Sequence, residues 1–400
     1  MTTTKILLNR QGNDIFIGNL LGLTLLKTII LQLFHLLYGR DNPYIAYVIY
    51  GALFAYMYYG VISRYFITNK RLAVYFLSLA FFGLCYLIGP AACQQYYTSI
   101  DVTLVFIYYI PIAVFLIPEI NDTNVVFSRL ALFRYIAIAV AAYMVFLGGY
   151  QNAEQDNYME FSYALLPFVL TSFYATYNGK KWLNLVLYVV GVIVITFYGA
   201  RTPLLISVLF PIVTVVLRKG KLSFEKLLLL FIAAVLIMVI IANLSSVLGV
   251  LGRYGESVGS YALSKLQTNA FWDSSTRNDI YDHAFRLIEE KSGAPMGLFA
   301  DRIYLDVIYV HNIFLEFIID YGIILGVALS LAIIYLMLRS YKINKDWNVR
   351  LFLLFWFCVV FVRFLVSGSY LVEGISFVYF SILIRYSRLN KKTVKAWKVK

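Results

Sequence analysis

The chain has 400 residues, of which 61% are hydrophobic and only 14% are charged. Soluble domains carry about 25% charged residues, so this composition excludes an ordinary soluble protein and is typical of a polytopic α-helical membrane protein. The net charge of +13 would suit nucleic acid. Excess Lys and Arg in a membrane protein lie mostly in cytoplasmic loops, however, so we expect no nucleic-acid partner.

Apolar runs near the length of a membrane span recur along the chain and predict about twelve transmembrane helices. The predicted cores are residues 15–38, 44–62, 72–90, 102–118, 131–149, 161–178, 182–199, 202–217, 226–247, 320–338, 350–368 and 373–387. The runs do not alternate in polarity, which argues against a β-barrel. The predicted fold class is therefore an all-α integral membrane protein with one large loop that contains amphipathic helices.

The positive charges follow alternate loops, which predicts the orientation of the spans. With the amino terminus inside, the inner segments hold 24 of the 34 Lys and Arg residues, the outer segments hold eight, and two lie within spans. Both termini are therefore expected in the cytoplasm. The predicted organisation is a membrane bundle (1–247), an extracytoplasmic helical loop (248–319), spans ten to twelve (320–388) and a basic cytoplasmic tail (389–400).

The extracytoplasmic loop contains a predicted amphipathic helix that runs from Thr276 to about Lys291. Thr276 is a candidate N-cap, because Asp279 follows three residues later with the spacing of a capping box. Ser292-Gly293 and then Pro295 end the helix. Its apolar stripe comprises Ile280, Tyr281, Ala284, Phe285, Leu287 and Ile288.

Arg277 lies in the first turn of this helix, where the helix dipole disfavours a cation. One interpretation is a surface ion pair with Asp279 or Asp282. The other is an anion site, because free backbone N–H groups at a helix N-terminus and a guanidinium both bind phosphates. The sequence leaves both interpretations open.

Arg201 begins the eighth predicted span at its outer end, with almost no loop before it. Its side chain either snorkels to lipid headgroups or is held between two helices, where it would suit an anionic ligand. His311 lies where the chain re-enters the membrane. A lone His is more often structural, but it can serve as a base at neutral pH. The candidate residues to orient it are Asp306, Glu316 and Asp320, and their spacing does not choose among them.

Arg363 lies near the outer end of the eleventh span, where an intramembrane cation is a functional hypothesis and snorkelling is the alternative. The candidate substrate-binding residues are Arg253, Tyr254, Arg302, Arg363 and Tyr370. The three cysteines form no motif, no residues have metal-ligand spacing, and no nucleotide-binding glycine motif is present. We therefore expect neither a metal nor a cofactor.

In these residues the chain resembles the O-antigen polymerase and O-antigen ligase superfamily of bacterial membrane glycosyltransferases. The resemblance covers roughly residues 180–380. The first feature is an Arg at the outer start of a span, here Arg201. The second is an Arg that opens a loop helix before a Pro/Gly turn, here Arg277 through Pro295-Met296-Gly297. The third is His-Asn before a short apolar helix and a Gly-containing turn, here His311-Asn312 through Tyr321-Gly322. Ala200 departs from the family, which often has Ser there.

The resemblance implies a GT-C-like enzyme that carries out metal-independent, inverting glycosyl transfer from an undecaprenyl diphosphate-linked glycan. The reaction would occur at the outer face of the bacterial cytoplasmic membrane. Arg201 and Arg277 would stabilise the leaving diphosphate, and His311 would take the proton of the acceptor hydroxyl. The implied partners are the lipid-linked donor, the glycan acceptor and membrane lipids, and a chain-length regulator and a flippase are candidates.

The residues do not decide between the two activities of the superfamily. A polymerase joins lipid-linked repeat units of an O-antigen, capsule or exopolysaccharide, whereas a ligase transfers the finished glycan to another acceptor. We favour the polymerase because it occurs with more kinds of bacterial polysaccharide. A polysaccharide transporter or flippase is the alternative from another class, and it predicts internal repeats that the sequence does not show.

Overall fold

The computed structural model describes residues 2–38, 43–146, 158–179, 182–198, 200–218 and 275–388, and every regular element in this part of the chain is helical. Seven helices are long and apolar enough to cross a membrane: Arg10–Tyr38, Tyr44–Ser63, Asn69–Ile88, Ile100–Glu119, Thr123–Phe146, Ile313–Ile343 and Trp347–Val366. Shorter apolar helices are Trp182–Tyr198, Arg201–Leu217 and Ile375–Ser387. The protein is therefore an all-α, multi-pass membrane protein.

The predicted spans agree with these helices except at a few ends. Eleven of the twelve predicted cores overlap a helix, and the core at 226–247 lies outside the described residues, so the count of twelve stays a prediction. The predicted tenth span lies within α16 (Ile313–Ile343). Gly322 has non-helical angles and divides this helix, so the predicted start at residue 320 lies close to the break, and a short apolar helix precedes it as predicted.

The chain folds as two compact units, whose boundaries fall inside α1 (Thr2–Tyr38), α2 (Pro43–Ser63) and α6 (Thr123–Leu132). The first unit comprises Met1–Ile17, Phe54–Val126 and Ser275–Lys400, and the second comprises Gly18–Leu53 and Phe127–Ser274. Of the residues assigned to catalysis from the sequence, His311 and Arg277 therefore belong to the first unit and Arg201 belongs to the second.

The second unit is an apolar helical bundle. It includes α7 (Arg134–Phe146), α8 (Tyr158–Gly179), α9 (Trp182–Tyr198) and α10 (Arg201–Leu217). α8 packs against the other three helices, and Gly191 permits a close approach, because a Cβ there would lie 2.5 Å from Val169. The buried guanidinium of Arg134 donates to Asn184 Oδ1 at 2.9 Å, so this polar group is satisfied inside the bundle.

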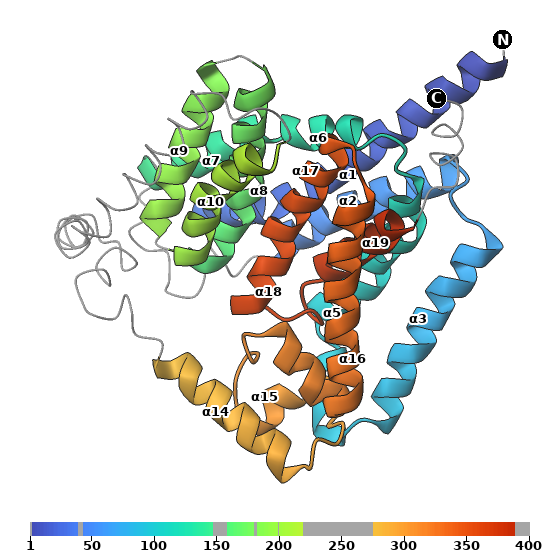
Figure 1. Ribbon diagram of the computed structural model, residues 1–400, viewed down its shortest axis with the longest axis vertical. Helices are drawn as coiled ribbons and strands as arrows, with labels where there is room; N and C mark the ends of the chain where they lie inside the picture. The colour runs from blue at the N-terminus through green and yellow to red at the C-terminus, as the bar shows by residue number, and fades with distance from the viewer. Residues whose placement is uncertain are drawn as a thin grey trace. The chain divides into compact units, whose positions relative to one another are not determined.

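The first unit is built around α16 and α19 (Ile375–Ser387), which pack against each other. Ser381 of α19 donates to the Ala113 carbonyl at 2.5 Å, which ties α19 to the span Ile100–Glu119. In Figure 1, α16 runs upward from α14 and α15 at the lower end of the view. The remaining elements of this unit include α3 (Asn69–Ile88), α14 (Ser275–Glu290), α15 (Ala300–Tyr304), α17 (Trp347–Trp356) and α18 (Val362–Val366).

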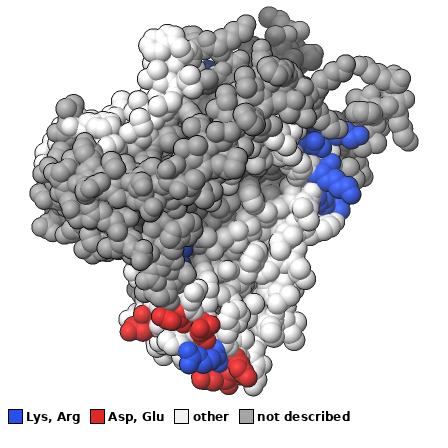
Figure 2. Space-filling view, turned by 60° about the vertical axis from the view of Figure 1, so that its left-hand side comes forward, with Lys and Arg blue, Asp and Glu red and all other residues white. Residues whose placement is uncertain are grey.

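Helix ends that the sequence assigns to the same side of the membrane meet in the first unit. At one end, Arg71 at the start of α3 pairs with Glu119 at the end of the next span. At the other end, Gly297 lies against Pro90, which follows α3. Figure 2 shows acidic side chains around a small basic group at the lower end and a basic patch at the upper right. This arrangement agrees with the prediction that successive spans run in opposite directions through the membrane. The compartment that each end faces stays a prediction.

α16 is broken at Gly322, whose φ of 78° and ψ of 166° are not helical. The turn that follows α14 docks into this break. Ile323 N donates to the Gly293 carbonyl at 2.9 Å, and Met296 N donates to the Ile319 carbonyl at 3.0 Å. The turn thus pairs backbone groups that the break leaves without helical partners. A short helical segment before Gly322 is thereby separated from the long span after it.

α14 confirms the predicted loop helix and corrects two of its details. It spans Ser275–Glu290 and packs against α16, with Ala284 and Leu287 buried. Thr276 is the second residue of the helix rather than its N-cap, because helical geometry begins before it. Phe285, which was predicted in the apolar stripe, is 58% exposed. The face that packs against α16 is therefore narrower than the apolar pattern indicates.

Replacing Gly322 with Ala should destabilise the first unit. A Cβ at this position would lie 2.9 Å from both the Gly293 oxygen and the Pro295 nitrogen, at a positive φ that favours glycine. We expect a loss of about 1–3 kcal/mol, measured as a lower midpoint of thermal unfolding in detergent. Gly83→Ala is the matched control, because a Cβ there meets nothing within 4 Å and Ala favours helix. Equal midpoints for the two variants would contradict this account of the break.

Candidate active site around His311

His311 lies in the loop between α15 and α16, at the point where that loop meets α14. The Tyr281 hydroxyl of α14 donates to the His311 carbonyl at 3.3 Å. The Tyr309 ring packs edge-on against the imidazole, with 4.4 Å between ring centroids. His311 has a φ of 58°, a strained conformation for a residue with a side chain. Such strain persists only where the surroundings impose it, and it is concentrated at functional sites.

The imidazole of His311 is held in its neutral form. Burial first, and then the charge of Arg277, lower the pKa of His311 to about 4, and a hydrogen bond to the Val366 backbone opposes the shift. Nδ1 is buried and has no hydrogen-bond partner among the described residues. A neutral imidazole carries one unprotonated nitrogen that can accept a proton. At neutral pH the side chain is therefore available as a base.

Arg277 places a positive charge near this imidazole. It is half-buried in the first turn of α14, where backbone N–H groups lack helical partners. Among the described side chains it forms no ion pair with Asp279 or Asp282, which are both exposed. This favours the anion-site interpretation over the surface ion pair, because the guanidinium and the helix N-terminus offer their charge in the same place.

Three buried carboxylates lie near the His311 loop, and each is at most 2% exposed: Asp301, Glu316 and Asp320. Asp301 accepts hydrogen bonds from Arg302 N at 3.0 Å and from Val310 N at 3.1 Å. Burial raises the pKa of Asp301, whereas the adjacent Arg302 opposes that shift. Asp301 thus fixes the backbone directly before His311. The sequence analysis did not single it out, although an Asp-Arg pair within an apolar stretch was a usable signal.

Glu316 and Asp320 hold another segment, the loop 367–374 between α18 and α19. Glu316 accepts hydrogen bonds from Ser369 Oγ and from Tyr370 N, the latter at 3.4 Å. Asp320 accepts from the Tyr370 hydroxyl at 2.7 Å. Asp306, the third residue proposed to orient His311, is exposed. Among the described residues, His311 instead contacts Tyr281, Tyr309 and the Val366 backbone.

The same loop carries a partner for Arg363. Glu373 pairs with Arg363 at 2.7 Å, and the two side chains are 20% and 21% exposed. The Ser367 hydroxyl lies 3.3 Å from that of Tyr309, which connects this loop to the His311 loop. The ion pair explains how a cation is accommodated near the end of an apolar span. The sequence analysis missed Glu373, which could have been recognised as the nearest acidic residue after Arg363.

Two other sequence-predicted residues lie in this end of the first unit. Arg302 stacks on Tyr96 and Phe299, with its guanidinium carbon 5.1 and 4.7 Å from the ring centroids. Tyr370 is buried in the carboxylate network, and burial raises the pKa of its hydroxyl well above the ordinary value. Both residues thus contact protein groups rather than presenting a free surface, and their roles in substrate binding stay predictions.

The remaining residues that the sequence predicts for the site do not lie near His311 in the described part of the first unit. Arg201 is exposed at the first residue of α10 in the second unit, and α9 ends at Tyr198, so the short junction is confirmed. Arg253 and Tyr254 lie outside the described residues. Within the described part of the chain, no group of three or more His, Cys, Asp or Glu side chains is placed to hold a metal ion. The carboxylates near Tyr370 accept hydrogen bonds from Ser369 and Tyr370 and so hold the loop 367–374.

Comparison of the chain with protein-family models, with characterised proteins and with solved structures gives no match.

The pKa of His311 tests the geometry directly. The chain has three histidines, so histidine-labelled protein should give three titrating NMR signals, and His311→Gln identifies the one from His311. We expect a pKa of about 4, and Arg277→Gln should raise it because a repelling charge is removed. Burial should still hold the pKa of His311 below 6.5 in that variant.

Arg286→Gln, an exposed change on the same helix, is the control. A wild-type pKa near 6.5, or no response to Arg277→Gln, would reject this electrostatic account.

Proposed function

We propose that the protein is a glycosyltransferase that polymerises polyprenyl diphosphate-linked oligosaccharide units at the outer face of the bacterial cytoplasmic membrane. One observation carries the proposal: a neutral, half-buried His311 lies close enough to Arg277, in the first turn of α14, for that charge to lower its pKa. A proton acceptor and an anion-binding group are thus available to one reaction at the end of a membrane-spanning helix.

The reaction needs both groups at once. The acceptor hydroxyl oxygen attacks the anomeric carbon of the donor, and the bond from that carbon to the diphosphate oxygen breaks. The hydroxyl proton passes to His311, which acts as general base. The electron pair of the broken bond leaves on the diphosphate, whose growing negative charge is stabilised by Arg277 and by the N–H groups of the first turn of α14.

The outer location and the role of Arg201 rest on the sequence. The count of positive charges assigns the segment that contains α14 and His311 to the extracytoplasmic side. A lipid-linked donor is suited to that side, because its leaving diphosphate is already activated and no nucleotide sugar is needed. The role of Arg201 as a second cation for the diphosphate stays a prediction from the resemblance to the superfamily.

The test is chain growth by the purified protein. It would be supplied with a panel of polyprenyl diphosphate-linked oligosaccharides, and the products would be sized by mass spectrometry. We expect a ladder of lengths from the wild type. His311→Gln and Arg277→Gln should each lower the rate by about 10²–10³-fold, the usual effect of removing a general base or a charge-stabilising group.

The matched controls are His283→Gln and Arg286→Gln, which make the same changes at exposed positions of α14 and should leave chain growth intact. Wild-type protein that yields no ladder would refute the polymerase. Transfer of a single glycan to a different acceptor would instead identify a ligase. Full turnover by His311→Gln would remove the general base from the mechanism.

A further inference from the structure

In the described part of the first unit, α3 packs along one side, with Tyr75 against Phe115 and Phe82 against Phe106 and Phe377. Phe82 is its only buried residue, although the helix is long and apolar enough to cross a membrane. In Figure 1, α3 descends at the right-hand edge of the view. An open groove of about 1400 Å³ lies between α3, α19 and the span Ile100–Glu119. The described side chains line this groove without filling it.

The walls of this α3 groove are mostly apolar. α3 contributes every fourth residue, Val74, Ser78 and Phe82, which is the spacing of one helix face. The opposite wall is formed by side chains that include Ile110, Phe377 and Phe380. Hydrocarbon chains are the occupant that such walls accommodate, because the groove lies along helices that cross the membrane.

One end of the α3 groove is basic. Five Lys and Arg side chains and a single acidic side chain, Asp346, line this end; the basic residues are Lys70, Arg71, Lys345, Arg385 and Arg388. They come from the start of α3, the end of α19 and the link after α16. Segments far apart in the sequence thus bring positive charge to one place, which complements an anionic headgroup.

Two of these arginines are fixed by the fold. Arg71 donates to the Phe66 carbonyl at 2.8 Å and pairs with Glu119. Arg385 donates to backbone carbonyls at the end of the span Ile100–Glu119. Lys70 and Arg388 are exposed at the same end. The charge of Arg71 is balanced by Glu119, so the positive charge at this end of the groove comes from the fixed Arg385 and from the exposed Lys70 and Arg388 beside it.

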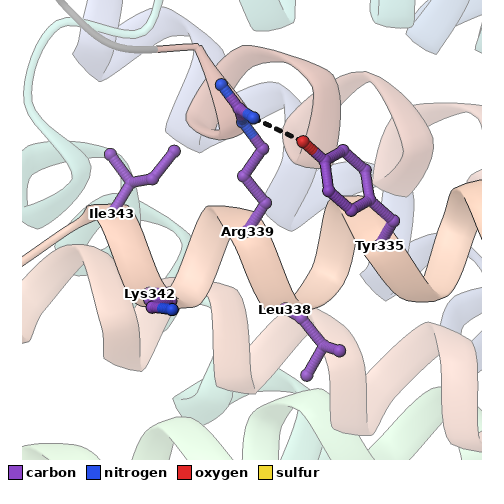
Figure 3. Close-up of a pocket in the computed structure, with 5 residues that line it drawn as sticks. All are labelled: Tyr335, Leu338, Arg339, Lys342 and Ile343. Atoms are coloured by element: carbon purple, nitrogen blue, oxygen red, sulfur yellow. Dashed lines mark hydrogen bonds between the residues drawn. The ribbon is translucent and has the colours of Figure 1, made fainter.

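The neighbouring surface of α16 has the composition of a membrane interface. Figure 3 shows a hollow lined by Tyr335, Arg339 and Lys342, in which Arg339 donates to the Tyr335 hydroxyl. Ile343 lines both this hollow and the α3 groove, so the two lie at the same end of α16. Tyrosine and basic side chains together are typical of the headgroup level of a bilayer.

We propose that the α3 groove binds an anionic phospholipid, with its acyl chains along the apolar walls and its phosphate at the basic end. This lipid is distinct from the glycan donor of the proposed reaction. The basic end follows α16, whereas His311 precedes it, and the span from Ile323 to Ile343 separates the two by about 30 Å. The inference does not depend on the proposed enzymatic activity.

The headgroup is tested by charge reversal. The full-length protein in mild detergent would be titrated with phosphatidylglycerol or with phosphatidylcholine of the same acyl chains, and bound lipid would be counted by native mass spectrometry. We expect preference for phosphatidylglycerol, which Lys70→Glu should weaken at least about fivefold, the contribution of one basic side chain near an anionic headgroup. Lys342→Glu, at the same end but outside the α3 groove, should bind like wild type. Equal binding of the two lipids, or equal loss in both variants, would overturn the proposal.

The acyl chains are tested by blocking the α3 groove. Ser78→Trp places a large side chain on its α3 wall and should reduce binding of phosphatidylglycerol. Leu77→Trp adds similar bulk on the same helix, at a position that is 68% exposed and does not line the groove. It should leave binding unchanged. The proposal fails if Ser78→Trp binds phosphatidylglycerol as wild type does, because the groove then holds no lipid. It also fails if the wild type is a dimer and Ser78→Trp is a monomer, because the groove then holds a second copy of the chain.

Discussion

The break in α16 at Gly322 is the constraint on which the first unit depends. A long apolar helix would otherwise continue through this point, and its backbone groups would be paired only within the helix. The break exposes those groups, and the turn after α14 pairs with them through Gly293 and Met296. Gly326 completes the arrangement, because a Cβ there would lie 2.6 Å from Ile318 Cα, so the short segment packs tightly on the long span. α14 is thereby anchored beside the start of α16, where His311 lies.

That anchoring explains why so many polar groups are buried at one end of an apolar unit. Asp301 holds the backbone before His311, while Glu316 and Asp320 hold the loop after α18 through Ser369 and Tyr370. Buried carboxylates are costly unless they are hydrogen-bonded. Here they fix the loop that contains His311 and a second loop that contacts Tyr309. The strained φ of His311 is consistent with a side chain positioned by its surroundings.

The sequence predicted those features that depend on local pattern. Apolar runs located the helices, and the polar helix before Pro295 was confirmed as α14. The missed features depend on how loops fold against helices and against each other. Glu316 and Asp320 were proposed as partners of His311, but the fold directs them to Tyr370, some fifty residues later. The pairing of Arg363 with Glu373 and the role of Asp301 likewise follow from how loops meet, which spacing alone does not determine.

The central claim is that His311 and Arg277 act as one site, a base whose strength responds to a bound diphosphate. The most direct measurement is the pKa of His311, followed by NMR as inorganic pyrophosphate is added. Pyrophosphate bound at Arg277 should offset its charge and raise that pKa from about 4 toward 6.5, and Arg277→Gln should abolish the response. If the wild-type pKa does not move, or moves equally in Arg277→Gln, the two residues do not form the site described.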